Sequence, residues 1–179
     1  FYDYYLPMRM RNFGTEEQQE LSWLVNEFKE GRKDATPYFL TAIARLGISG
    51  NLTVLFMPCS NEHNYYLRFS PLAKQLARYK ELHPELYGMT YIARRKSKHK
   101  SVDRSQISVS SNIVIDANVV GKQNCILIDD VCTTGNSIRA HIAELKNYGV
   151  HVVGVVCLGR TALIPSHEKI MDQARKDNK

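Results

Sequence analysis

Two adjacent carboxylates and the short hydroxyl-rich turn after them are the residues whose types and spacing best suit chemistry. The segment from 125 to 137 is Cys-Ile-Leu-Ile-Asp-Asp-Val-Cys-Thr-Thr-Gly-Asn-Ser. Its apolar first residues predict a buried strand, which brings Asp129 and Asp130 to its carboxyl end. The turn leads into a predicted helix from about Ser137 to Tyr148, with Gly149 as its stop. Polar groups therefore gather where a strand turns into a helix.

The turn has the properties of a phosphate-binding loop. N–H groups in the first turn of a helix have no partner within the helix and carry partial positive charge, so they accept an anion such as phosphate. Gly135 lets the backbone approach the anion closely. Thr133, Thr134 and Ser137 add hydroxyl donors, and Asn136 completes the turn.

The two carboxylates must face a different part of the ligand, because they would repel a phosphate. A ribose supplies that part, since its 2′- and 3′-hydroxyls donate to carboxylates. A nucleotide hydrolase would need a G-x-x-x-x-G-K-[ST] loop, but Gly121-Lys122 is followed by Gln123 and lacks the upstream glycine. An ordinary strand–turn–helix would leave two adjacent acids with nothing to bind. We therefore favour one ligand with a phosphate at one end and a free diol.

The elements around this segment alternate between helix and strand. Two helices are expected between residues 16 and 46, broken at Gly31, with Thr36 capping the second and Pro37 in its first turn. Ser70-Pro71 is expected to open a third helix. Strands are expected at 52–57, 89–93, 113–115, 125–128 and 150–158.

Apolar strands that alternate with helices are typical of a parallel sheet covered on both faces. The expected fold class is therefore α/β, with a parallel twisted sheet, helices on both faces and an N-terminal helical hood. We expect a single domain overall, with the hood segment at 1–50 and the core at 51–179. Ligands of such sheets bind beyond the carboxyl ends of the strands, which is where the turn of segment 125–137 falls.

Segment 125–137 resembles the signature of type I phosphoribosyltransferases, in which two acidic residues precede a Thr-Thr-Gly loop that binds 5-phosphoribosyl-1-pyrophosphate (PRPP). The wider layout is similar to the ComF-type, amidophosphoribosyltransferase-like branch of that superfamily. The matching stretches are Leu24–Arg32, the strand that ends at Pro58, Arg68-Phe69, the basic stretch from Arg94 to Gln106, and Ser111-Asn112. The chain departs from that branch at Arg68-Phe69-Ser70-Pro71, where its members have Gly-Phe-Asn-Gln.

The resemblance implies a glycosyltransferase that moves the 5-phosphoribosyl group of PRPP to a nitrogen acceptor and releases pyrophosphate. In such an enzyme Asp129 and Asp130 hold the ribose diol and stabilise the cationic sugar. Thr133, Thr134, Gly135, Asn136 and Ser137 bind the 5′-phosphate. Mg²⁺ arrives with PRPP, and Asp129 and Asp130 are its candidate protein ligands. The loop after the first strand holds the pyrophosphate, and its candidate residues are Cys59, Ser60 and Asn61.

A basic stretch lies between the strands expected at 89–93 and 113–115. Residues 94–104 contain six lysines and arginines, and Asp103 is the single acid among them. By its position the resemblance implies a lid over the pyrophosphate, with Lys96, Lys98, Lys100 and Arg104 as its candidate residues. A solvated surface loop or a nucleic-acid patch is the alternative. The N-terminal hood and Leu158–Thr161 are expected to recognise the acceptor.

Composition narrows the other possibilities. The formal charge of +6 suits an anionic ligand or nucleic acid. The alternative to catalysis is therefore a PRPP-sensing regulatory or nucleic-acid-associated protein of the same fold, for example in competence or DNA processing. The four cysteines form no C-x-x-C pair, and no apolar run is long enough to span a bilayer, so we expect a cytoplasmic protein without a membrane partner. The expected partners are PRPP, an unidentified acceptor and a second copy in a homodimer.

Overall fold

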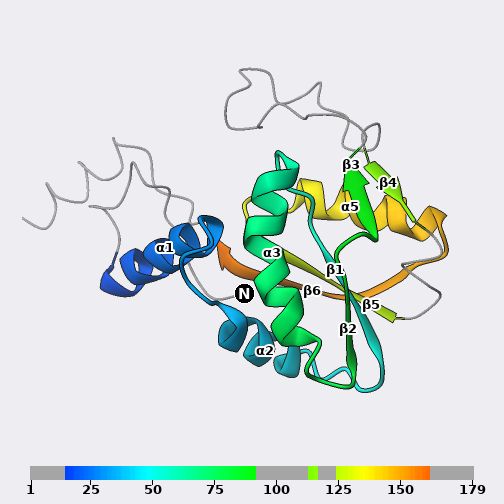
Figure 1. Ribbon diagram of the computed structural model, residues 1–179, viewed down its shortest axis with the longest axis horizontal. Helices are drawn as coiled ribbons and strands as arrows, with labels where there is room; N and C mark the ends of the chain where they lie inside the picture. Colours follow the sequence, from blue (N-terminus) through cyan, green and yellow to red (C-terminus); the bar gives the residue numbers. More distant parts are fainter. Residues whose placement is uncertain (1–14, 92–112, 117–123, 162–179) are drawn as a thin grey trace, which may run out of the picture.

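The computed structural model of the 179-residue chain describes residues 15–91, 113–116 and 124–161. A four-stranded sheet with the order β2-β1-β5-β6 forms its centre. β1 (Leu52–Phe56) pairs in parallel with β2 (Leu82–Glu85) and with β5 (Asn124–Cys132), and β5 pairs in parallel with β6 (His151–Arg160). The sheet is twisted, so the parallel strands β1 and β6, which are not neighbours, cross at a large angle in the view of Figure 1. All four carboxyl ends lie at one edge.

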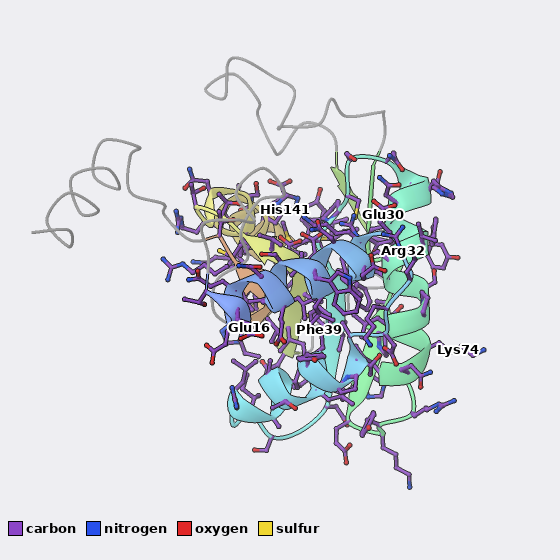
Figure 2. The ribbon with its side chains drawn as sticks, turned by 90° about the vertical axis from the view of Figure 1, so that its left-hand side faces the viewer. Glu16, Glu30, Arg32, Phe39, Lys74 and His141 are labelled. Atoms are coloured by element: carbon purple, nitrogen blue, oxygen red, sulfur yellow. The ribbon has the colours of Figure 1, made fainter. Side chains whose placement is uncertain are left out.

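Helices cover both faces of this sheet. The first face is covered by α1 (Glu16–Lys29), α2 (Thr36–Arg45) and α3 (Glu62–Leu76), and the second face by α5 (Asn136–Asn147). Figure 2, which looks onto α1, shows α3 with Lys74 on one side of the molecule and α5 with His141 on the other. The α/β fold class, the parallel sheet and the N-terminal helices are confirmed.

Alternation of side chains along the strands divides the core into two layers. Val54 of β1 and Ile126 of β5 pack against α1, α2 and α3, whereas Leu55 and Leu127 pack on the side of α5. The rings of Phe28 and Phe39 hold α1 against α2, with centroids 5.5 Å apart. Because every residue of β1 is buried, the sheet is a rigid base for the loops that leave its carboxyl edge.

The start of α3 differs from the prediction. This helix begins after Asn61, whose Oδ1 accepts a hydrogen bond from the Asn64 N–H at 2.8 Å, and Pro71 lies inside the helix rather than at its start. Proline was expected to open a helix because it lacks an N–H group. In α3 the loss of that donor frees the carbonyl of Leu67, which lies close to Gly31. The earlier start brings the first turn of α3 to the end of β1.

The strand assignments need two corrections. β2 was not predicted, because Leu82-His-Pro-Glu has no apolar run, and its proline is tolerated at the edge of the sheet. β3 (Met89–Tyr91) and β4 (Ile113–Ile115) were predicted as strands, but they pair with each other in a separate antiparallel sheet. The parallel sheet therefore uses β2 and not the strand at 89–93.

The second helix also has a different cap from the one predicted. Ala35 is the N-cap of α2, and Thr36 is the first residue of the helix, with Pro37 beside it as expected. The side chain of Asp34 accepts a hydrogen bond from the Thr36 N–H at 2.8 Å. Asp34, rather than Thr36, therefore provides the side-chain acceptor at the start of this helix. In the ranges that the structure describes, no helix is long and apolar enough to cross a membrane.

Candidate functional site

The turn after β5 forms the first half of the candidate site. Gly135 has φ +74° and is the N-cap of α5, so a residue without a Cβ is needed there. Thr133 and Thr134 are exposed beside it, and the Oγ1 atoms of Thr133 and Thr161 are 3.2 Å apart. The first turn of α5 contains no acidic residue. The structure therefore gathers the predicted residues Thr133–Ser137 around an exposed helix N-terminus suited to an anion.

Arg139 lies against this turn and was missed by the sequence analysis. Its Nη2 donates to the Thr134 carbonyl at 3.0 Å and to the Asn136 Oδ1 at 2.6 Å. A Cβ placed on Gly135 would lie 3.1 Å from its Nη1, so the glycine also makes room for the guanidinium. A cation at a helix N-terminus opposes the helix dipole, and Arg139 makes no ion pair with any carboxylate of the described residues. The guanidinium of Arg139 therefore adds a full positive charge to the partial positive charge of the backbone N–H groups in this turn.

The two aspartates lie inside β5, which continues to Cys132 and does not end before them as predicted. Asp130 contacts Arg68 of α3 and Lys29 of α1, on the face of Ile128, whereas Asp129 pairs with Cys157 of β6, whose side chain lies on the face of Leu127. Asp129 is therefore on the side of α5 and its turn, and Asp130 is on the side of α1 and α3. That both carboxylates hold one ribose diol stays a prediction.

Asp130 is paired with two cations. Its Oδ2 accepts a hydrogen bond from Nη1 of Arg68 in α3, and its Oδ1 lies 3.8 Å from Nζ of Lys29 in α1. The residue is only 8% exposed, although a carboxylate at the carboxyl end of a strand would be expected to face solvent. Lys29 and Arg68 had no predicted role, although both lie in stretches that carry the resemblance. Their partner is distant in sequence, and only the fold brings the three together.

The loop after β1 forms the second half of the site. The Met57 N–H donates to the Ile128 carbonyl at 2.7 Å, which ties the end of β1 to β5. Cys59 is buried, and burial raises the pKa of its thiol to about 12, so it is not a nucleophile near neutral pH. The Asn61 side chain caps α3, and Ser60 lies partly buried between them. These three predicted residues stand at the N-terminus of α3.

The electrostatics of Asp129 differ from those of an ordinary surface carboxylate. Burial, and next the charge of Asp130, raise the pKa of Asp129 to about 8. The backbone N–H of Asp130 donates to its Oδ1 at 2.8 Å and partly offsets this rise. No group of three or more metal-ligating side chains occurs within residues 15–91, 113–116 and 124–161.

Several predicted residues cannot be placed. Lys96, Lys98, Lys100 and Arg104 lie outside the described residues, as do the aromatic residues of the first fourteen positions. Trp23 of the N-terminal segment is 52% exposed on α1, with Lys33 Nζ 5.5 Å from its ring centroid. At the end of β6 Leu158 is buried, and the Thr161 N–H donates to the Cys132 carbonyl at 3.0 Å.

The fold and the site together define a class of protein. Helix N-termini from opposite faces meet the carboxyl edge of a parallel sheet, with an acidic pair in the strand between them, as suits an α/β protein that binds a phosphorylated sugar. The phosphoribosyl transferase domain family matches residues 67–170, which is more than half of the chain. The chain belongs to this family.

Comparison with solved structures gives a more distant similarity. The adenine phosphoribosyltransferase of Thermoanaerobacter pseudethanolicus is 15% identical to the chain, with a TM-score of 0.46 over 86% of this chain and 79% of that one. No curated protein matches the chain in sequence.

Proposed function

We propose that this chain is a phosphoribosyltransferase that binds PRPP across the carboxyl edge of the sheet, between the ends of β1 and β5. The observation that supports this most directly is the pair of helix N-termini. The N-terminus of α5 approaches this edge from one face of the sheet and that of α3 from the other. PRPP has a phosphate at one end of its ribose and a pyrophosphate at the other, so two anion sites separated by an acidic strand suit its shape and charge.

The proposed orientation follows from which side each residue lies on. The 5′-phosphate binds the Thr133–Ser137 turn, because this turn lies at the N-terminus of α5, Thr133 and Thr134 are exposed in it, and Arg139 lies beside it. The pyrophosphate binds the loop of Cys59, Ser60 and Asn61 at the start of α3. The ribose lies between them against the acidic pair, with Asp129 on the side of the phosphate turn.

The proposed reaction is substitution at the anomeric carbon of the ribose. The bond from this carbon to the pyrophosphate oxygen breaks, a bond to a nitrogen of the acceptor forms, and that nitrogen loses a proton. The sugar becomes cationic as the leaving group becomes more negative. Carboxylates beside the ribose and donors at the two helix N-termini stabilise these opposite charges in the transition state.

We propose that Mg²⁺ binds to this site together with PRPP. Asp129 is the carboxylate best placed to share the ion with PRPP, because both oxygens of Asp130 already contact cations, and the bound ion would displace the proton that burial holds on Asp129. The bound ion would neutralise charge on the pyrophosphate and orient it. The chain's own residues hold the two ends of PRPP and keep the ribose against β5.

Within the type I phosphoribosyltransferase superfamily, we propose that the chain belongs to the ComF-type branch. Lys29 and Arg68, which meet at Asp130, come from two of the stretches that resemble that branch. We further propose that the segment 1–50 works as a hood, since Lys29 of α1 reaches the site, and that it recognises the nitrogen acceptor together with Leu158–Thr161.

A binding and turnover experiment tests the proposed function. Calorimetry with PRPP, ribose 5-phosphate and pyrophosphate, each with Mg²⁺, should show binding of all three, and the melting temperature should rise with their concentration. Pyrophosphate release is then measured with a panel of nucleobases and ammonia as acceptors. Binding without turnover, together with a salt-dependent nucleic-acid affinity that PRPP changes, would favour the sensor. Absence of binding to any phosphate compound would refute the site.

A further inference from the structure

Arg68 joins the two halves of the candidate site. Its Nη1 donates to the Asp130 carboxylate of β5 and also lies 3.1 Å from the Cys59 Sγ in the loop after β1. The side chain is 12% exposed. A single guanidinium therefore spans the distance between the acidic strand and the loop at the start of α3.

This guanidinium is not fully satisfied. Its Nε is buried and has no hydrogen-bond partner among the described residues. Its contact with Cys59 is to a thiol, which is a weak acceptor, and burial keeps this thiol protonated by raising its pKa to about 12. A buried donor without a partner costs stability, so such groups point to an acceptor that arrives with a ligand.

The charges around Arg68 also favour an anion. Lys29 and Arg68 both contact Asp130, so two cations face one carboxylate on this side of β5. Asp129, the next carboxylate, pairs with Cys157 of β6, whose side chain lies on the side of α5. The side chain of Lys29 is 24% exposed. Two cations therefore lie beside Asp130, close to the N-terminus of α3, where they favour an anionic ligand.

We propose that Arg68, held by Asp130 and assisted by Lys29, binds the pyrophosphate group of the ligand, and that Asp130 is a positioning residue for this guanidinium. This inference rests on the proposed function and changes the role of one residue in it. Asp129 holds the ribose diol, whereas Asp130 fixes the cation that receives the leaving group. The acidic pair thus serves both ends of the reacting bond, one carboxylate on each face of β5.

A purely structural role is the alternative. Buried ion pairs between helix and strand often do no more than hold a fold together, and breaking one by removing a partner destabilises the protein. Such a pair would affect binding of both halves of PRPP equally, through the stability of the edge. The two roles therefore differ in which half of the ligand loses affinity.

The experiment compares Asp129→Asn, Asp130→Asn and Arg68→Gln in calorimetry with Mg²⁺-pyrophosphate and, separately, with ribose 5-phosphate. Arg68→Gln and Asp130→Asn should each weaken pyrophosphate binding by about tenfold or more, with little effect on ribose 5-phosphate. Asp129→Asn should show the reverse. Arg78→Gln, which removes an exposed charge after α3, is the control and should change neither affinity.

Two further variants keep the test decisive if the buried substitutions unfold the chain. Lys29→Met leaves the contact between Arg68 and Asp130 in place, and should weaken pyrophosphate binding several-fold. Arg68→Lys retains a cation and should recover part of the affinity that Arg68→Gln loses. Selective loss of ribose 5-phosphate affinity in Asp130→Asn, or unchanged pyrophosphate affinity in both Arg68→Gln and Lys29→Met, would overturn the inference. If the unaltered protein binds neither compound, the proposed function itself fails.

Discussion

The two glycines that flank α5 offer a matched test of the phosphate turn. Gly135 at its N-terminus has φ +74°, and Gly149 after its C-terminus has φ +77°. Alanine in this left-handed region costs about 1–2 kcal/mol, while the loss of backbone freedom in the unfolded chain returns about 0.4–1 kcal/mol. Gly135→Ala and Gly149→Ala should therefore each reduce the free energy of unfolding by about 1 kcal/mol.

The surroundings of the two glycines differ, and this separates the variants in function. A Cβ at Gly149 meets no atom within 4 Å, whereas a Cβ at Gly135 lies 3.1 Å from the Arg139 Nη1. The flexible guanidinium can move aside at little cost in stability. Its hydrogen bonds to Thr134 and Asn136 would be lost, and the new methyl group would stand where a phosphate approaches the backbone.

We therefore expect similar melting temperatures but different affinities. A change of about 1 kcal/mol corresponds to about 2–4 °C for a chain of this size. Gly135→Ala should weaken ribose 5-phosphate binding by about tenfold or more, as expected when charge-assisted hydrogen bonds are lost, and Gly149→Ala should leave it unchanged. Denaturant unfolding and calorimetry measure the two quantities. Equal affinity in both variants and the unaltered protein would refute the assignment of this turn to the phosphate.

Three more predictions use other features of the structure. Arg139→Gln should lower ribose 5-phosphate affinity by about tenfold in calorimetry without changing pyrophosphate affinity, and equal losses for both would contradict its place at the turn. Burial and the charge of Asp130 raise the pKa of Asp129 from 3.8 to about 8, so the folded protein holds a proton there that the unfolded chain releases. The free energy of unfolding should therefore fall as pH rises between these values, by at most about 1.4 kcal/mol per unit, and Asp129→Asn should remove this slope in denaturant titrations across that range. Gly31→Ala should destabilise the protein by about 1–2 kcal/mol more than Gly47→Ala. Both glycines have positive φ, but a Cβ at Gly31 would lie 2.9 Å from Leu67, whereas a Cβ at Gly47 would meet no atom within 4 Å. Equal melting temperatures of the two variants would show that α3 moves away from the new methyl group at no cost in stability.

The sequence alone determined the elements whose signals are local. The apolar run that begins at Cys125 is buried in β5, and the predicted helix after it is α5, which buries Ile138 and Leu145. The end of α5 was predicted from Gly149, because glycine favours the turn that ends a helix. The structure has this turn, in which the Val150 N–H donates a hydrogen bond to the Leu145 carbonyl. Periodicity and turn chemistry act within a few residues, so one chain is enough to reveal them.

The motif could also be recognised without the fold, because the residues from Asp129 to Ser137 are contiguous. In sequence order, these residues predict the end of a strand, an anion-binding turn and the start of a helix. The match of residues 67–170 to the phosphoribosyl transferase domain family agrees with that interpretation.

Only the tertiary structure decided what the two carboxylates face. The side chains of Arg68 and Asp130 meet across 62 positions of sequence, and Lys29 reaches the same carboxylate from α1. Such contacts depend on how α1 and α3 pack on β5, and no local pattern specifies that packing. The length of β5 had the same origin: pairing with β6 extends the strand to Cys132 and so places Asp129 and Asp130 on opposite faces. Backbone hydrogen bonds to a neighbouring strand, rather than the apolar run itself, determine where this strand ends.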